Sequence, residues 1–548
     1  MSIFSPPLLF VALTGIRLAT ARQVNISVSA STSLGDLPPI ARFFGCDEPN
    51  YATYPDGRAL LSHLGALGGP QQTYFRTHNL LTTCDPSNDT APHQLKWGCT
   101  DAYTEDADGN PIYNFTTTDL IFDAYLENGV KPYVQTGFMP KALSVFPDPY
   151  SFEFNGGASA DNIFTGWTNP PTSWSKWGEL IFQWAKHCVE RYGAEEVGSW
   201  YWEVWNEPNI AYWNGTEDEY FMLYDYAVDG VLRALPNATV GGAEVAGGAA
   251  GDWLGLFLNH TLNGQNAANT KRTGAPLDFI SFHAKGSPTF INATDATPGH
   301  LRMNMASSLQ NVDDAFSVIS SFGGTLSELP IVIGEDDPDS CAACLSPEVD
   351  YRNGLIYPSY TAAAFARQID LAAQHRVNLT GALTWAFEYD DHPYFDGFRG
   401  GRVEANSTGQ AGLGDVLENS VHGGDSDVGV LGSVSEDGSR MALMIWNYHD
   451  DALPKPDAQI ALRVSGAFEG RETIELTHYR IDETHSNAYA AWLELGSPQN
   501  PTQEQISGLK KAGMLQSLRP ASILQLTDGI IDIQFALPIH AVSLLVME

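Results

Sequence analysis

Short apolar runs alternate with segments of helical periodicity over most of the chain, from about residue 40 to 405. Val130–Thr136 is one such run and predicts a strand. Trp174–Tyr192 has large apolar side chains every three or four residues, which predicts a helix that begins after Ser173 and ends at Gly193. Repeated strand–helix units over roughly 365 residues favour an α/β fold of the (β/α)8 TIM-barrel type with long loops.

Further strands and helices continue this pattern. The strands are expected at Trp200–Trp205, Leu277–His283, Leu329–Gly334 and Ala382–Phe387, and the helices at Tyr220–Leu235 and Ala362–Ala373. A doubly wound parallel sheet is the alternative arrangement, but no G-x-G-x-x-G opens a strand–helix unit here. We therefore expect a catalytic barrel over residues 40–405.

The pattern changes after a Gly/Asp-rich segment, and we interpret residues 406–427 as a linker. Residues 428–548 contain short strands separated by turn residues, which is typical of a β-sandwich. Its strands are expected at Val428–Gly432, Arg440–Tyr448, Gln459–Val464, Thr473–Ile481 and Ile530–Phe535. Val24–Val28 alternates like a strand, so the segment 22–39 is expected to join the sandwich rather than the barrel.

The N-terminus resembles a secretory signal peptide. The apolar run Leu8–Leu13 is followed by Ala19-Thr20-Ala21, so residues 1–21 are expected to be removed; an ordinary N-terminal strand is the alternative. The chain also contains nine N-x-S/T sequons, which together indicate a secreted, extracellular glycoprotein. Their asparagines are Asn25, Asn88, Asn114, Asn214, Asn237, Asn259, Asn292, Asn378 and Asn406.

Charge narrows the range of partners. The chain has 65 acidic and 29 basic residues, for a net charge of −36. Such a field repels a phosphate backbone and an anionic membrane surface, so we expect neither as a partner. After the N-terminal run, no stretch approaches the ~20 apolar residues that span a bilayer.

Six cysteines add local constraints. Cys84 and Cys99 bracket a loop rich in Pro, Asn and Asp, which a disulfide would close. Cys341 and Cys344 form a C-x-x-C, but no second C-x-x-C or histidine pair accompanies them, so a local disulfide is favoured over zinc. Cys188 falls on the apolar face of a predicted helix and is expected to be a buried thiol.

The clearest chemical signal is Trp205-Asn206-Glu207-Pro208-Asn209, at the end of a predicted strand. Functional side chains of a (β/α)8 barrel lie at this end of the strands. A carboxylate there suits acid/base chemistry on a sugar, and Asn206 could bind a sugar 2-hydroxyl. Asp47-Glu48-Pro49-Asn50 repeats part of the motif, and we interpret it as a solvated turn, or at most a substrate contact.

A second carboxylate ends the buried run Pro330–Gly334. Glu335 is the first residue after this expected strand, so its side chain should point into the mouth of the barrel. A retaining glycosidase needs such a group as nucleophile, about 5–5.5 Å from the acid/base. Asp336, Asp337 and Asp339 follow it and are expected to form a solvated acidic loop.

Several ordered motifs resemble family 39 of the glycoside hydrolases, which holds β-xylosidases and α-L-iduronidases. The resemblance covers about residues 40 to 545. In the barrel, the motifs that carry this resemblance are Tyr74-Phe-Arg76-Thr-His78, Lys131-Pro-Tyr-Val-Gln-Thr-Gly-Phe138-Met139-Pro140-Lys-Ala-Leu143, Trp202-Glu-Val-Trp-Asn206-Glu207-Pro208-Asn209, Asp278-Phe-Ile-Ser-Phe-His283-Ala-Lys285-Gly286 and Trp385-Ala-Phe387-Glu388. Those in the sandwich are Tyr479-Arg-Ile-Asp482-Glu-Thr-His485-Ser-Asn487 and Gly496-Ser-Pro498-Gln-Asn500-Pro501.

The resemblance implies roles for individual residues. Glu207 would be the acid/base and Glu335 the nucleophile. The remaining expected site residues hold or surround the sugar: His78, Asn206 and His283 line the subsite, Lys285 lies near the nucleophile, and Phe138, Tyr389, Tyr394 and Phe395 form apolar walls or pack in the core. This chemistry requires no metal and no cofactor.

The sequence therefore predicts a secreted retaining exo-glycosidase that acts on an oligosaccharide. The favoured activity is that of a β-xylosidase releasing xylose from xylo-oligosaccharides. His283-Ala-Lys285-Gly286 also resembles the iduronidase branch, in which such a lysine meets a uronate carboxylate. The alternatives are therefore a glycosidase for an arabinosyl or uronic acid residue, and a non-catalytic carbohydrate-binding protein. Nothing in the sequence indicates the oligomeric state.

Overall fold

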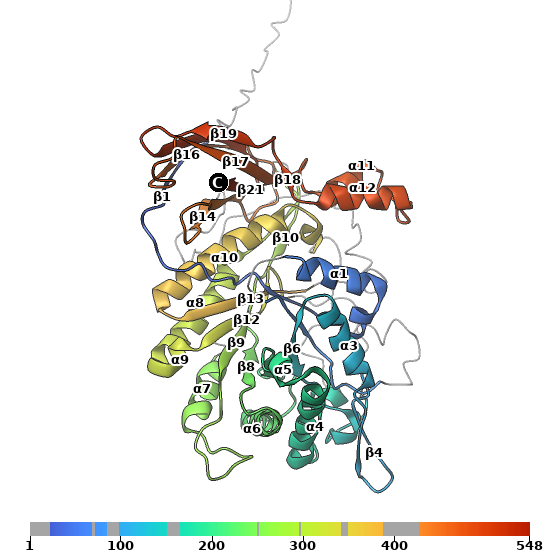
Figure 1. Ribbon diagram of the computed structural model, residues 1–548. Coiled ribbons are helices and arrows are strands. Elements are labelled where there is room, and N and C mark those ends of the chain that lie inside the picture. Colours follow the sequence, from blue (N-terminus) through green and yellow to red (C-terminus); the bar gives the residue numbers. More distant parts are fainter. Residues whose placement is uncertain are drawn as a thin grey trace, which may run out of the picture.

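The computed structural model describes residues 22–67, 72–84, 98–150, 165–248, 251–294, 297–340, 349–386 and 427–548. Eight parallel strands form a closed barrel at its centre (Figure 1). In order around the barrel they are β2 (Phe43–Cys46), β3 (Tyr74–Thr77), β6 (Lys131–Thr136), β7 (Tyr201–Val204), β8 (Thr239–Val245), β9 (Phe279–Lys285), β12 (Pro330–Asp337) and β13 (Asn378–Thr384). Because β13 pairs with β2, the sheet has no edge, which confirms the barrel and excludes the doubly wound sheet.

Among the described residues, seven long helices follow the first seven strands and surround the barrel. They are α1 (Pro55–Gly65), α3 (Thr116–Glu127), α4 (Trp174–Tyr192), α6 (Glu217–Ala234), α7 (Trp253–Asn263), α8 (Met305–Phe322) and α10 (Ile356–His375). Short elements complete the barrel: α5 (Ala194–Val197), α9 (Gly324–Glu328), the hairpins β4 (Tyr103–Glu105)–β5 (Pro111–Tyr113) and β10 (Thr289–Ile291)–β11 (His300–Arg302), and the 3-10 turns at Pro49–Thr53, Lys141–Leu143, Gly166–Thr168 and Asp350–Asn353.

Capping residues explain where two helices begin. Helix α4 has the predicted bounds, and the Ser173 side chain accepts a hydrogen bond from the Lys176 amide. Helix α6 begins at Glu217, earlier than predicted, because Thr216 and Glu219 form a reciprocal capping box. The two helices pack closely, since a Cβ on Gly230 would lie 2.6 Å from the carbonyl oxygen of Gly178.

Aromatic side chains fill the barrel at the N-terminal ends of its strands. Phe43, Tyr74, Tyr201 and Phe279 each begin a strand, and their rings contact one another at centroid distances of 4.9–5.8 Å. Inward-pointing residues nearer the other end are polar and charged, such as Arg76 and Glu203, both fully buried. The packing therefore closes one end of the barrel and leaves the chemistry at the C-terminal ends of the strands.

A C-terminal β-sandwich accompanies the barrel, which confirms the predicted fold class (Figure 1). One sheet contains β1 (Gln23–Ser29), β16 (Ala458–Ser465) and β20 (Ile530–Leu537). The other contains β14 (Asp427–Val434), β15 (Met441–Tyr448), β21 (Val542–Met547), β17 (Thr473–Ile481), β18 (Gln516–Ser517) and β19 (Ser522–Gln525). Apolar side chains from both sheets share one core, and the helices α11 (Ala488–Glu494) and α12 (Gln503–Gly513) lie beside β18.

The N-terminal segment belongs to the sandwich by its pairing. Strand β1 runs parallel to β16, with Ile26 opposite Leu462 and buried in the sandwich core. The sandwich also contacts the barrel: Arg302 of the β10–β11 hairpin pairs with Asp451 through Nη2 and Oδ2 at 2.8 Å. The chain therefore begins in one domain, forms the other, and returns. Residues 1–21 and the linker up to residue 426 lie outside the described residues.

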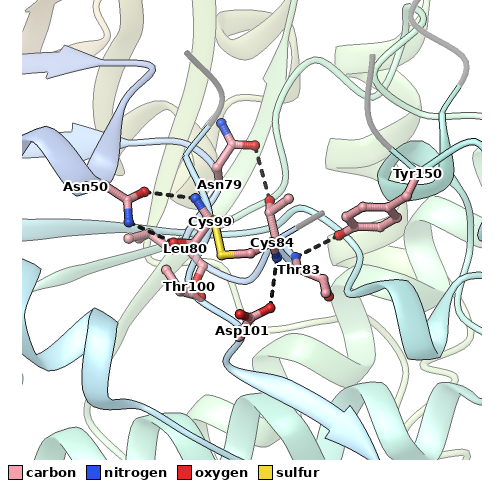
Figure 2. The surroundings of a disulfide bond; sticks show 10 residues. Asn50, Asn79, Leu80, Thr83, Cys84, Cys99, Thr100, Asp101 and Tyr150 are labelled. Carbon is pink, nitrogen blue, oxygen red and sulfur yellow. Dashed lines mark hydrogen bonds between the residues drawn. A yellow bond between two sulfur atoms is a disulfide. The ribbon is translucent and has the colours of Figure 1, made fainter. Parts of the chain in front are cut away.

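The predicted disulfide between Cys84 and Cys99 is confirmed (Figure 2). Asn50 holds the same segment, because its side chain donates to the Cys99 carbonyl and accepts from the Cys99 amide, both at 2.8 Å. A cross-link closing a loop of this length stabilises a fold by about 3 kcal/mol, mainly by constraining the unfolded chain. The free thiol of Cys188 is buried as predicted, whereas Cys341 and Cys344 lie outside the described residues.

Within the part of the chain that the structure describes, no helix is both long enough and apolar enough to cross a bilayer.

Candidate active site

Glu207 and Glu335 lie together at the C-terminal ends of the barrel strands. Glu207 follows β7, and Glu335 lies within β12. An oxygen of one carboxylate lies within 4.8 Å of an oxygen of the other. Both residues are largely buried, with 9% of Glu207 and 4% of Glu335 exposed. The structure thus brings together the two carboxylates that the sequence singles out.

Local backbone features aim both side chains into the mouth of the barrel. Trp205 and Glu207 have φ angles of 71° and 45°, so the chain turns sharply as it leaves β7. The Glu207 amide then donates to the carbonyl of Glu244 on β8, at 2.9 Å. In β12 the register with β9 shifts between Ile333 and Glu335. This irregularity sets the direction of Glu335 independently of the strand before it.

Basic groups surround the Glu335 carboxylate. Its Oε1 accepts from Arg76 Nη1 and contacts His78 Nε2, both at 3.0 Å, and its Oε2 accepts from Lys285 Nζ at 2.6 Å. Burial alone would raise the pKa of Glu335, but His283, Lys285 and His78 hold that pKa well below its usual range. Glu335 is therefore ionised and hydrogen-bonded over the whole neutral range.

His283 connects the two sides of the site. Its Nδ1 lies 2.8 Å from Oε1 of Glu207 and 3.6 Å from Oε2 of Glu335, while its Nε2 faces Glu244. Burial lowers the pKa of His283, yet the charges of Glu335, Glu244 and Glu207 outweigh burial and raise it to about 9. At neutral pH the imidazole is therefore a cation that donates to Glu207.

Arg76 organises the floor of the site, a role that the sequence did not reveal. Its guanidinium donates to Glu203 at 2.6 Å, to Glu335 at 3.0 Å and to Asn206 Oδ1 at 2.9 Å. Glu203 also accepts from Tyr133 at 2.7 Å. The sequence contained one sign of this role, because an arginine and a glutamate lie inside otherwise apolar strands. A buried charge is stable there only with an oppositely charged or hydrogen-bonding partner.

Aromatic rings pack around His78. Phe138 stacks against it at a centroid distance of 6.0 Å, and Trp385 meets it edge-on at 4.8 Å. Phe138 is only 1% exposed and also packs on Trp167 and Tyr212, so it lies behind His78 as part of the core. Trp385 also faces Lys285, with Nζ 5.8 Å from the ring centroid. Tyr389, Tyr394 and Phe395 lie outside the described residues.

The acidic residues after Glu335 are not a solvated loop, and this prediction was wrong. Asp336, Asp337 and Asp339 are 6%, 3% and 2% exposed. Strand β12 extends through Asp337, where Arg352 donates to both carboxylate oxygens at 2.7 and 2.8 Å. Asp336 accepts from Gln368 on α10 at 2.9 Å. Burial raises the pKa of Asp336 and of Asp337 to about 7, so each charge depends on these partners.

The motif Asp47–Asn50 is likewise not a solvated turn. Glu48 and Pro49 are buried, and the Asp47 side chain is 14% exposed, with Oδ1 at 3.8 Å from His78 Nε2. The segment is covered because Asn50 binds Cys99 and Asn79 donates to the Asp47 carbonyl at 3.4 Å. Asp47 therefore belongs to the wall of the site beside His78.

Glu207, His283 and Glu335 could in principle offer three ligand atoms to a metal ion. Their charges argue against this use. His283 carries protons that point at carboxylates, and Lys285 and Arg76 already neutralise Glu335. A cation would have to displace these groups, so the donor set fits acid/base and nucleophilic chemistry better than metal binding.

Comparison with known proteins identifies the family of the chain. The family model for glycosyl hydrolases family 39 matches residues 76–409 and 413–521, which is most of the chain. The chain is 26% identical over 471 residues to a β-xylosidase of Geobacillus stearothermophilus, covering 81% of this chain and 82% of the relative. It is 24% identical over 448 residues to an α-L-iduronidase of Mus musculus, covering 73% and 63%.

A solved structure shows the same fold. The GH39 enzyme from Xanthomonas axonopodis pv. citri superposes with a TM-score of 0.67 at 20% identity, covering 98% of this chain and 99% of that one. The match extends over the barrel and the sandwich together. With the family model matched over most of its length, the chain belongs to family 39 of the glycosyl hydrolases.

Proposed function

We propose that this glycoside hydrolase is a retaining exo-acting β-xylosidase that releases xylose from xylo-oligosaccharides. The observation that carries the mechanism is the approach of the Glu207 and Glu335 carboxylates to within 4.8 Å. Retaining enzymes hold the two groups about 5–5.5 Å apart, whereas inverting enzymes leave about 6.5–9.5 Å for a water molecule. The spacing therefore supports direct attack by one carboxylate on the sugar.

The residues around each carboxylate indicate which one is the nucleophile and which one is the acid/base. Glu335 is the nucleophile, because Arg76, His78 and Lys285 keep its carboxylate ionised at the pH of the reaction. It attacks the anomeric carbon, and the bond to the leaving oxygen breaks. Glu207 protonates that oxygen and then, as a carboxylate, takes a proton from the water that hydrolyses the glycosyl-enzyme. Its contact with His283 places a proton partner 2.8 Å away through this cycle.

Xylose is favoured as the sugar by the similarity to β-xylosidases and by the state of Lys285. The ammonium group lies 2.6 Å from Glu335 and 3.9 Å from Asp337, so its charge is already matched by two carboxylates. A uronic acid glycosidase is the second candidate. A lysine at the end of β9, beside the nucleophile, and the 24% identity to an α-L-iduronidase favour it.

A panel of aryl glycosides tests the proposed activity. We expect hydrolysis of the β-D-xyloside to exceed that of the α-L-arabinoside and the α-L-iduronide, with the first-formed xylose retaining its anomeric configuration by NMR. Xylotriose should lose single xylose units from one end. An inverted product contradicts the retaining mechanism, and preference for the iduronide favours the second candidate.

Lys285→Met measured on the same panel separates two roles of the lysine. If Lys285 only stabilises ionised Glu335, its loss raises the pKa of that nucleophile. Because the nucleophile must be ionised, the acidic limb of the kcat/KM profile then moves to higher pH, and activity falls by a similar factor on every glycoside. If Lys285 binds a sugar carboxylate, the iduronide is affected selectively. The exposed Lys271→Met is the matched control, and unchanged kinetics in Lys285→Met contradicts both roles.

We further propose that the enzyme is secreted after cleavage near Arg22 and is N-glycosylated. Seven of the nine sequon asparagines lie in the described residues and all seven are exposed; Asn88 and Asn406 lie outside them. Intact mass of the protein from the medium of a eukaryotic culture, before and after enzymatic removal of N-glycans, tests this. We expect a loss of mass on deglycosylation and a final mass matching residues 22–548. A mass of 59.6 kDa without sugar contradicts the proposal.

A further inference from the structure

Glu244 is a fully buried glutamate of the barrel, 2.7 Å from the histidine that contacts Glu207. It lies on β8 with a φ angle of 53° and no exposed surface. A carboxylate so deep in a barrel is costly unless cations or proton donors surround it. The proposed reaction does not use Glu244, so its retention needs another explanation.

Glu244 contacts the segments that carry both catalytic groups. Its backbone carbonyl accepts from the Glu207 amide at 2.9 Å. Its carboxylate lies against Gly334, the residue before Glu335, so closely that a Cβ there would fall 1.9 Å from Oε1. Only glycine leaves room for the carboxylate at this point of β12. The residues next to both catalytic groups therefore hold Glu244 in place: the Glu207 amide after β7 and Gly334 on β12.

The carboxylate of Glu244 also contacts the imidazole of His283, which lies beside Glu207. Oε2 of Glu244 lies 2.7 Å from Nε2 of His283, an ion pair rather than a well-aligned hydrogen bond. A nitrogen lone pair that close to an anionic oxygen would be repelled, so Nε2 carries a proton. The other ring nitrogen, Nδ1, is then the one that exchanges a proton with Glu207 at 2.8 Å.

We propose that Glu244 is a positioning residue for the acid/base: its negative charge fixes the Nε2–H form of His283 and keeps Nδ1 basic enough to share a proton with Glu207. This inference rests on the proposed role of Glu207. When Glu207 carries the proton, Nδ1 accepts a hydrogen bond from it. When Glu207 is a carboxylate, Nδ1 is protonated and donates. One proton thus moves between Glu207 and Nδ1 of His283. The negative charge of Glu244 stabilises His283 when the imidazole is protonated.

Other charges near His283 support this assignment. The groups that face it are Glu207 after β7, Glu244 on β8 and Glu335 on β12. Burial alone would raise the pKa of Glu244, yet Arg76 and His283 lower it to about 2, so it remains anionic. Its neighbour Glu203 accepts from Arg76 at 2.6 Å and from Tyr133 at 2.7 Å, so Glu244 is the glutamate of this pair that faces His283.

Two variants test the role of the charge on Glu244. Glu244→Gln removes the negative charge beneath His283, so the proton shared by His283 and Glu207 is held less tightly and is lost at lower pH. For an aryl xyloside with a poor leaving group, which depends on acid catalysis, the basic limb of kcat/KM should move down by about one pH unit. Asp225→Asn is the matched control: it removes a buried carboxylate 3.0 Å from another histidine, His260, on helices α6 and α7, and should leave the basic limb in place.

Two further measurements cover the case in which Glu244→Gln does not fold. Glu244→Asp retains the charge, so its basic limb should stay near that of the wild type even if kcat falls. In the wild-type protein, ¹⁵N-histidine spectra, assigned by comparison with His283→Gln, should show doubly protonated His283 at pH 7. A neutral imidazole at that pH, or an unmoved basic limb in folded Glu244→Gln, overturns the inference.

Failure of this inference is distinguishable from failure of the proposed function. The roles of Glu207 and Glu335 are tested by azide rescue, which does not depend on His283. If azide rescues a Glu207 variant while Glu244→Gln has a wild-type basic limb, only the positioning role of Glu244 is wrong. If azide instead rescues a Glu335 variant and gives a product of retained configuration, the proposed roles of both catalytic glutamates are wrong.

Discussion

Glu335→Gln is expected to lower kcat/KM on every substrate by roughly five orders of magnitude. Glutamine retains the shape of the side chain but cannot form a stable glycosyl-enzyme, so the reaction loses its first step. It also leaves the cationic groups of Arg76 and Lys285 without the carboxylate that they bind. The measurement is turnover of an activated aryl xyloside, together with a search for the covalent intermediate by intact mass, which should find none.

Asp336→Asn is the matched control for that substitution. Asp336 is the next residue and equally buried, but its carboxylate accepts from Gln368 on α10 and not from the groups at the mouth of the barrel. Its amide variant should retain activity within about tenfold. A folded Asp336→Asn without activity, beside an active Glu335→Gln, would show that the nucleophile is misassigned by one residue.

Both carboxylates of the site could be located from the sequence because each ends an apolar run. The buried strand Pro330–Gly334 and the strand before Glu207 are readable as local patterns, and a barrel brings the ends of such strands together. The disulfide was also a local inference, since Cys84 and Cys99 close one loop. Features of this kind depend on residues close together in the chain.

The acidic residues that follow Glu335 show where such reasoning fails. A run of aspartates is usually solvated, and the groups that bury this one come from later segments of the chain. Arg352 reaches Asp337, and Gln368 reaches Asp336 from helix α10. No pattern near residue 336 indicates either partner. The prediction of a solvated loop was wrong because the residues that bury these aspartates lie elsewhere in the sequence.

The network beneath the carboxylates was hidden for a similar reason. Arg76, Glu203 and Glu244 lie on three different strands, and their contacts follow from the register of β3, β7 and β8 in the closed barrel. Register depends on pairing between distant segments, which a single sequence does not display. A charged residue within an apolar strand is therefore better treated as a sign of an unseen partner than as an exception.

Glu207→Ala is expected to differ in kind from Glu335→Gln. The nucleophile remains, and a phenolate with a low pKa can depart without a proton, so the glycosyl-enzyme still forms on an activated aryl xyloside. The second step lacks its base, so the intermediate should accumulate and release one equivalent of phenol in a burst. Steady-state turnover should fall by about three orders of magnitude, and more on substrates with poor leaving groups. Stopped-flow absorbance and intact mass measure the burst and the adduct.

Azide then separates the two roles. It needs no general base, and removal of the Glu207 side chain leaves space beside the anomeric carbon on the face opposite Glu335. Attack there displaces Glu335 from the intermediate, and because two inversions have occurred, the product is a β-xylosyl azide of retained configuration. In Glu335→Gln no intermediate forms, so any azide product would arise by one inversion from the substrate and have the α configuration. A β-azide from the Glu335 variant, or an α-azide from the Glu207 variant, would require the acid/base and the nucleophile to be exchanged.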